Sequence, residues 1–254
     1  MANIIIECSK YLMIILITIY AYQCFTVFGY EDEWEQKRIF RNQNRLMFMI
    51  HFMAFAGMYL KIGETKMLLF YVAQAGLLLA IILLYTRIYP KASRLIVNNM
   101  CMLLTIGFIM ITRLHYNKAV KQSIIVAGAI ALSLIVPVIV RKVKGLEELR
   151  IFYAGVGLVA LAAVVVIGQV SGGAKLGFEI AGFGIQPSEF VKILFVFFVA
   201  ASFNRSTQFK DIVITTIVAA FHVLILVISK DLGAALIIFV VYLEIGRASC
   251  RERV

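Results

Sequence analysis

Long apolar runs separated by short polar segments dominate the chain. Each run is continuous instead of alternating, which is typical of a helix surrounded by apolar material rather than of a strand with one solvated face. A helix that spans a membrane needs about 20 mostly apolar residues, each adding a rise of about 1.5 Å. The pattern predicts spans at residues 9–29, 46–62, 67–86, 97–113, 119–140, 151–169, 187–203 and 211–228, with another beginning near residue 232.

The composition supports a membrane protein. Of 254 residues, 62% are hydrophobic and only 15% are charged, and the mean hydropathy is +0.94. A water-soluble domain of this size could not bury so much apolar surface. The predicted fold class is therefore all-α: a polytopic helical membrane protein with about eight complete spans and one truncated span.

The formal net charge of +11 changes this picture little. The basic residues lie in short loops between apolar runs, as in membrane proteins oriented by positively charged inner loops, and they do not form the basic stripe of a nucleic-acid-binding surface. No nucleic-acid partner is expected. Placing loop 30–45 inside gives the inner loops more Lys and Arg than the outer ones, although the basic run at 113–121 opposes this choice. The N-terminus and segment 170–186 are then predicted to face outward.

Segment 170–186 is rich in glycine and is predicted to be a loop or a short interfacial helix.

The cysteines and histidines are dispersed without the spacing of metal ligands, so no metal site is predicted.

The final residues, 244–254, differ abruptly from the apolar run that ends at Leu243. Their sequence back-translates, codon by codon, to the constant region of a widely used short-read sequencing adapter. They are therefore interpreted as an artefact and left out of the fold prediction. A natural basic tail is the alternative. If the adapter interpretation holds, the chain is expected to be an N-terminal fragment of a longer protein.

The segment 182–192 places charged side chains at the start of an apolar helix. Gln186 is predicted to be the N-cap and Pro187 the first helical residue. Glu189 falls at the third position, where it could reach back to free N–H groups, and Lys192 follows one turn later on the same face. Ser188 is expected to join their network. These charges either pair at the membrane interface or form a polar groove that holds an anionic head group.

A second charged residue opens the last apolar run. Asp231 stands where its side chain would cap a helix that begins at Leu232. In the predicted topology it faces the same side of the membrane as Glu189 and Lys192, and it could pair with Lys192.

Together these motifs resemble the SEDS family (shape, elongation, division and sporulation; FtsW, RodA and SpoVE). The resemblance rests on Gln-Pro-Ser-Glu-Phe-x-Lys at 186–192, Asp-Leu-Gly at 231–233 and Gly-Ala-Lys at 173–175, and on Arg113-Leu114 with Ala119 and Gln122. It covers residues 97–243. The predicted organisation is thus an additional three-helix membrane region at 1–96, a SEDS-like core at 97–243, and the artefact at 244–254.

The resemblance implies a multi-pass protein of the bacterial cytoplasmic membrane that polymerises lipid II into peptidoglycan for cell division or cell shape. The implied partners are lipid II, which is linked to undecaprenyl pyrophosphate, membrane lipids and a class B penicillin-binding transpeptidase. No cofactor is implied, and a divalent cation remains an open alternative. The substrate-binding residues implied are Lys175, Gln186, Ser188, Glu189, Lys192 and Asp231.

The chain also departs from the family pattern. Leu176-Gly177-Phe178 stands where the family has a tryptophan, and the family's catalytic Asp belongs to an outer loop beyond the end of this chain. No catalytic residue is therefore predicted, and whether this chain is itself an enzyme stays open. Two other functions fit the charges: a transporter (flippase) of a polyprenyl-linked precursor, and a scaffold for a division complex.

Overall fold

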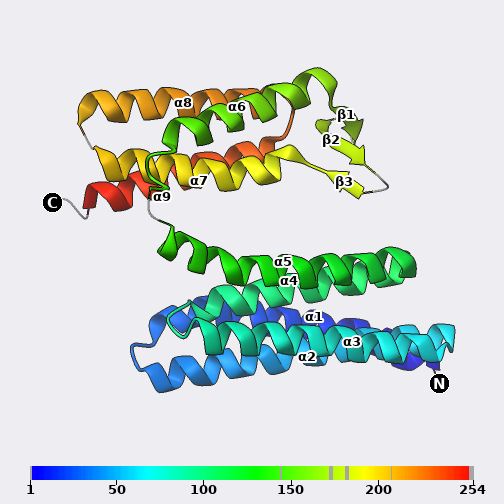
Figure 1. The fold of residues 1–254 in the computed structure, drawn as a ribbon. Coiled ribbons are helices and arrows are strands. Elements are labelled where there is room, and N and C mark those ends of the chain that lie inside the picture. The colour runs from blue at the N-terminus through cyan, green and yellow to red at the C-terminus, as the bar shows by residue number, and fades with distance from the viewer. Residues whose placement is uncertain (1, 144, 172–173, 181–182, 207, 252–254) are drawn as a thin grey trace. The chain divides into compact units, whose positions relative to one another are not determined.

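The computed structural model describes residues 2–143, 145–171, 174–180, 183–206 and 208–251 (Figure 1). Within these ranges the helices are α1 (Ala2–Thr26), α2 (Glu33–Ile62), α3 (Thr65–Ile88), α4 (Arg94–Leu114), α5 (Tyr116–Lys142), α6 (Arg150–Ile167), α7 (Pro187–Arg205), α8 (Phe209–Ile228) and α9 (Leu232–Arg251), with a 3-10 turn at Val27–Gly29. Nine helices of the described chain are long and apolar enough to cross a membrane. The predicted helical membrane fold is confirmed.

The main difference in helix length is at α2, which begins at Glu33 and not near residue 46. Asp32 caps this helix by accepting a hydrogen bond from the Trp34 N–H at 3.0 Å. Lys37 pairs with Glu33 one turn earlier, with 2.7 Å between Nζ and Oε2. A cap and ion pairs of this kind extend a helix through polar sequence, beyond the apolar run used for prediction.

The last helix also runs further than its apolar segment. The truncated span predicted from residue 232 is a helix of 20 residues that continues through Arg251. Helical structure in residues 244–251 does not bear on their origin, so the adapter interpretation stays a prediction.

The prediction of a loop or interfacial helix for 170–186 was wrong. The described residues of this segment form β1 (Gln169–Ser171), β2 (Ala174–Ile180) and β3 (Phe183–Ile185), an antiparallel sheet in the order β1-β2-β3, while 172–173 and 181–182 lie outside the described residues. Val170 pairs with Lys175, and Glu179 pairs with Gly184. The pairing satisfies backbone N–H and C=O groups between α6 and α7. β2 does alternate, with Lys175, Gly177 and Glu179 between apolar residues, but the many glycines of the segment favoured a loop in the prediction.

The chain divides into two compact units, residues 1–137 and 138–254. The boundary lies at Pro137 inside α5, where proline removes one backbone N–H from the helical ladder. The predicted division at residue 96 stays a prediction. Unit 1 has a core of buried side chains from α1–α5 that includes Met47, Leu78 and Phe108.

Unit 2 contains α6–α9 and the small sheet. Its core includes Phe195, Leu226 and Ile238 from three different helices. Figure 1 shows these helices side by side, with the strands at the end where α6 stops and α7 starts. The starts of α7 and α9 thus belong to one packed bundle.

The packing of α6 against α8 includes a glycine at a tight contact. His222 of α8 is fully buried, and its ring packs against Phe195 and Phe198 of α7 with centroids 5.3 and 6.2 Å apart. A Cβ atom added to Gly157 of α6 would lie only 2.7 Å from His222 Nε2. Because the imidazole is enclosed, it has no room to move away.

We expect Gly157→Ala to destabilise the protein by about 1–3 kcal/mol, since the added methyl group overpacks this contact. The matched control is Gly155→Ala in the same helix, where an added Cβ meets nothing within 4 Å. The control should be neutral or slightly stabilising because alanine favours helix more than glycine does. Unfolding of the purified protein in detergent would compare the two, and equal stability would contradict the packing role of Gly157.

Candidate functional site

The start of α7 matches the sequence prediction. Gln186 is the N-cap and Pro187 is the first helical residue. The Gln186 side chain does not cap the helix but extends toward Asp231. The backbone start of α7 therefore has no side-chain cap, and it retains the partial positive charge of a helix N-terminus.

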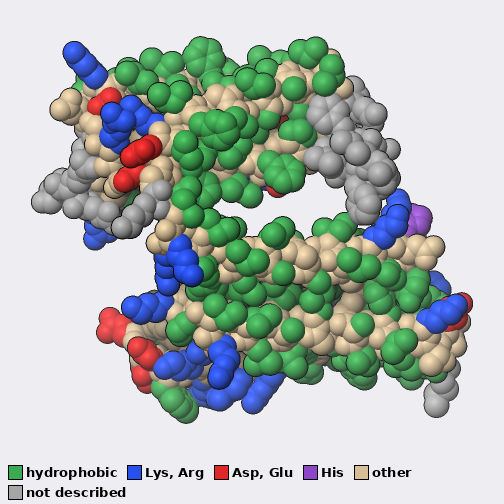
Figure 2. All heavy atoms as spheres, in the orientation of Figure 1, with side chains coloured by type: hydrophobic (Ala, Val, Ile, Leu, Met, Phe, Trp, Pro, Cys, Tyr) green, Lys and Arg blue, Asp and Glu red, His purple; other side chains and the backbone are tan. Residues whose placement is uncertain are grey.

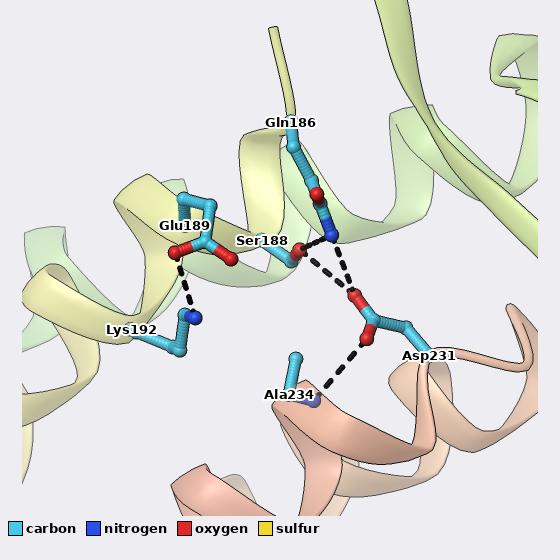
Figure 3. Close-up of polar contacts among 6 residues, drawn as sticks. All are labelled: Gln186, Ser188, Glu189, Lys192, Asp231 and Ala234. Atoms are coloured by element: carbon cyan, nitrogen blue, oxygen red, sulfur yellow. Dashed lines mark hydrogen bonds and ion pairs between the residues drawn. The ribbon is translucent and has the colours of Figure 1, made fainter. Parts of the chain in front are cut away.

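Glu189 and Lys192 form an ion pair at this end of α7 (Figure 3). Glu189 Oε2 lies 2.7 Å from Lys192 Nζ. Among the hydrogen bonds of the described residues, none joins the Glu189 side chain to the free N–H groups, so the predicted reach back to the helix start is not observed. The Glu189 side chain is 57% exposed and that of Lys192 20% exposed. Because the Glu189 partner is exposed, the pair contributes little stability and can exchange partners.

The stem of Lys192 lies in an apolar groove between α7 and α9. The groove has a volume of about 180 Å³, and Phe195 and Ile238 line it together with Lys192. The methylene groups of lysine favour such a surface while the ammonium stays at a polar edge. The pairing of Glu189 with Lys192 is thus present in the structure, and its location at the membrane interface stays a prediction.

Asp231 is positioned by the turn that ends α8. The Asp231 N–H donates to Leu226 O at 2.9 Å and the Lys230 N–H donates to Val227 O at 3.0 Å. Lys230 has a φ of +61°, in the left-handed region. This is the Schellman arrangement that commonly ends a helix, although glycine usually occupies the left-handed position.

The Asp231 carboxylate joins the starts of two helices, as Figure 3 shows. Its Oδ1 atom accepts a hydrogen bond from the Ala234 N–H at 3.2 Å, which confirms the predicted cap of α9. Its Oδ2 atom accepts from Ser188 Oγ at 2.9 Å and from Gln186 Nε2 at 3.1 Å. Asp231 therefore links α7 to α9 through three donors.

The predicted site residues form two polar groups at one end of unit 2. One contains Gln186, Ser188 and Asp231, and the other contains Glu189 and Lys192. The expected contacts of Lys192 with Ser188 and with Asp231 are replaced by these pairings. Ser188 is only 4% exposed, and its short side chain contacts the approaching Asp231 carboxylate. Lys192 pairs with Glu189 on its own helix.

The remaining predicted residue is Lys175, which lies in β2. Its side chain is outside the described part of the structure, and Gly173 of the same motif lies outside the described residues, so the substrate-binding role of Lys175 stays a prediction. No group of three or more His, Cys, Asp or Glu side chains in the described residues could hold a metal ion.

Comparisons with known proteins agree with the membrane fold and the motifs. The family model FtsW/RodA/SpoVE, described as "Cell cycle protein", matches residues 93–249. The chain is 31% identical over 88 residues to the protein named "Probable peptidoglycan glycosyltransferase FtsW" of Bacillus subtilis (strain 168), in a match that covers 33% of this chain and 22% of that protein.

A second relative matches over a longer region. The chain is 27% identical over 194 residues to "Peptidoglycan glycosyltransferase RodA" of Mycobacterium leprae (strain TN), covering 64% of this chain and 42% of that protein. The chain therefore spans less than half the length of these curated relatives. No solved structure matches the chain.

We expect a double-mutant cycle of Ser188→Ala and Asp231→Ala to show a coupling energy of about 1 kcal/mol or more, because a hydrogen bond to a charged group connects them. The free energy of unfolding in a detergent titration is the measurement. Ser202→Ala is the matched control, since Ser202 is also buried on α7 but is not among the contacts of Asp231. Additive effects of Ser188→Ala and Asp231→Ala would contradict the bridge.

Proposed function

Because the chain belongs to the FtsW/RodA/SpoVE family of cell cycle proteins, we propose that it binds lipid II and serves its polymerisation into glycan strands. It is a multi-pass protein of the bacterial cytoplasmic membrane. In the proposed reaction an acceptor sugar hydroxyl attacks the anomeric carbon of the donor and gives its proton to a general base outside the described residues, and the pyrophosphate-linked lipid leaves with the bonding electron pair. On the same ground we propose a class B penicillin-binding transpeptidase as partner.

One observation carries the proposal: Asp231 joins the starts of α7 and α9, and the Glu189–Lys192 ion pair lies beside this junction. Asp231 fixes the starts of α7 and α9. Glu189 and Lys192 lie at the same end of α7, in reach of a ligand that approaches from the membrane interface. Ionisable side chains at the ends of membrane helices are typical of sites that handle charged substrates.

The charges indicate how a pyrophosphate would bind. The negative charge of Glu189 neutralises the positive charge of Lys192, so the pair has no net charge while the two side chains remain in contact. The start of α7 has no side-chain cap and adds a partial positive charge that attracts phosphate. Pro187 has no N–H and the Glu189 N–H donates to Gln186 O at 3.1 Å, so this attraction comes mainly from the helix dipole. We propose that a pyrophosphate oxygen takes the place of Glu189 beside the Lys192 ammonium.

Asp231 has a different role in this proposal. Three donors already satisfy its carboxylate, so it is poorly suited to accept a proton from a substrate hydroxyl. We assign it as a positioning residue that keeps α7 and α9 together. None of the described residues is assigned as the general base.

A divalent cation is compatible with this site. Mg²⁺ commonly binds through one or two carboxylates and the phosphates of a substrate, and it does not require a cluster of protein ligands. Glu189, once released from Lys192, is the carboxylate that would supply such a ligand. The cation would offset charge on the pyrophosphate.

We expect Lys192→Met to weaken binding of lipid II to the chain in nanodiscs by about tenfold, equivalent to about 1.4 kcal/mol. Methionine keeps the apolar stem in its groove and removes only the charge. Lys210→Met is the matched control, because Lys210 lies at the start of α8 and Asp231 of the site follows the end of that helix. In Glu189→Gln, binding without Mg²⁺ should be retained, and any enhancement by Mg²⁺ should disappear. Equal affinities for Lys192→Met and the control would contradict the assignment of Lys192.

In a protein that contains this chain and has the full length of the curated relatives, we expect Glu189→Ala or Asp231→Ala to abolish glycan polymerisation from lipid II. The length and yield of the glycan product are measured at equal amounts of folded protein. Unchanged polymer in Glu189→Ala would refute the role of Glu189, and unchanged polymer in Asp231→Ala would refute that of Asp231. Transfer of labelled precursor across liposome membranes without polymer would instead favour the flippase function.

A further inference from the structure

Unit 1 contains a second polar site, away from the residues assigned above. It is a cavity of about 410 Å³ formed by the first half of α2, the end of α3 and the start of α4. Three basic side chains, Lys37, Arg41 and Arg94, line it, and its lining includes no acidic residue. Figure 2 shows Lys and Arg side chains gathered at the end of unit 1 where α2 begins.

Two of these basic residues lack a compensating charge. Lys37 pairs with Glu33. The ion pairs and hydrogen bonds of the described residues include neither Arg41 nor Arg94. Two guanidinium groups that face one cavity repel each other, so an anion between them would be stabilised.

The start of α4 adds to this positive potential. Ser93 is its N-cap but makes no side-chain cap hydrogen bond, and the first turn contains no acidic residue. The N-terminal end of the helix dipole is therefore uncompensated at Arg94. The helix start supports the site, and the two arginines define it.

Part of the cavity wall is apolar or aromatic, and Asn44, Thr86 and Asn98 add polar side chains. Ile82 and Leu83 of α3 line one side, and Leu83 is 58% exposed on the surface that would face lipid. Tyr85 and Tyr89 also line the cavity. Their hydroxyl groups contact Ser133 Oγ at 2.7 Å and Leu134 O at 2.5 Å on α5, so the two rings are fixed in place. Tyrosines of this kind are typical of the interface between lipid and water.

We propose that this cavity binds one anionic phospholipid of the surrounding membrane. The phosphodiester would lie between Arg41 and Arg94, whose planar guanidinium groups bind phosphate in a bidentate way. The acyl chains would follow Ile82 and Leu83 into the bilayer. A zwitterionic lipid fits less well, because its ammonium would enter a cavity that already holds three basic groups.

The rule that positively charged loops stay inside explains why basic residues lie on one side of a membrane. It does not explain why Arg41 and Arg94 line the same cavity. Arg41 and Arg94 come from helices separated by α3, yet they line the same cavity. Arg45, one turn further along α2, is exposed and does not line it. The site therefore predicts that Arg41 and Arg45 differ, whereas an orientation effect predicts that they act alike.

The test is native mass spectrometry of the purified chain in detergent, titrated with phosphatidylglycerol or phosphatidylcholine. The wild type should bind the first phosphatidylglycerol at least tenfold more tightly than phosphatidylcholine. The double variant Arg41→Gln/Arg94→Gln should lose this preference and the single variant Arg41→Gln should lose most of it, whereas the matched single control Arg45→Gln should keep it within twofold. Arg41→Lys/Arg94→Lys should retain an intermediate preference, and it replaces the glutamine variant if that variant does not fold.

Three results would overturn the proposal. An equal loss in Arg45→Gln would show a diffuse charge effect. Equal binding of both lipids by the wild type would show that the head group is not recognised. Displacement of phosphatidylglycerol by millimolar inorganic phosphate, with loss of the lipid signal, would show a site for free phosphate instead of a lipid.

Discussion

The arrangement of unit 2 depends on one carboxylate with three donors. A helix start exposes N–H groups without partners, and a membrane interface offers less water to satisfy them than a soluble surface does. Asp231 meets this need at α9 through one oxygen and holds the start of α7 through the other. The left-handed turn at Lys230 brings Asp231 to this position directly after α8. The ends of three helices are therefore fixed around a single side chain.

This arrangement separates a rigid part of the site from an adjustable one. Ser188 is buried and bound to Asp231, so this contact can change only if α7 and α9 move apart. Glu189 is more than half exposed, and its pairing with Lys192 can be exchanged at little cost. The proposed binding and release of a charged lipid would use both properties: fixed helices to define the shape of the site and a charge pair that can open.

The sequence predicted the features that depend on local pattern. The apolar runs located the spanning helices, proline and glutamine located the start of α7, and Asp231 was predicted as a cap. The contacts between helices were harder to foresee. Asp231 pairs with Ser188 and Gln186 because the turn after α8 gives Lys230 a positive φ, and a lysine in the sequence gives no indication of that conformation. The cavity at Arg41 and Arg94 likewise requires contacts between distant segments.

The two sites differ in how the positive end of a helix is compensated. At α7 the first turn contains Glu189, so an arriving phosphate must compete with a carboxylate already present. At α4 the first turn contains no acid, and the adjacent Arg94 adds positive charge. An internal competitor lowers the affinity for an anion and makes its release easier, which suits a substrate. A site without one favours continuous occupancy, which suits a structural lipid. An acidic residue in the first turn, as at α7, thus favours release of a bound anion, and its absence, as at α4, favours retention of the anion.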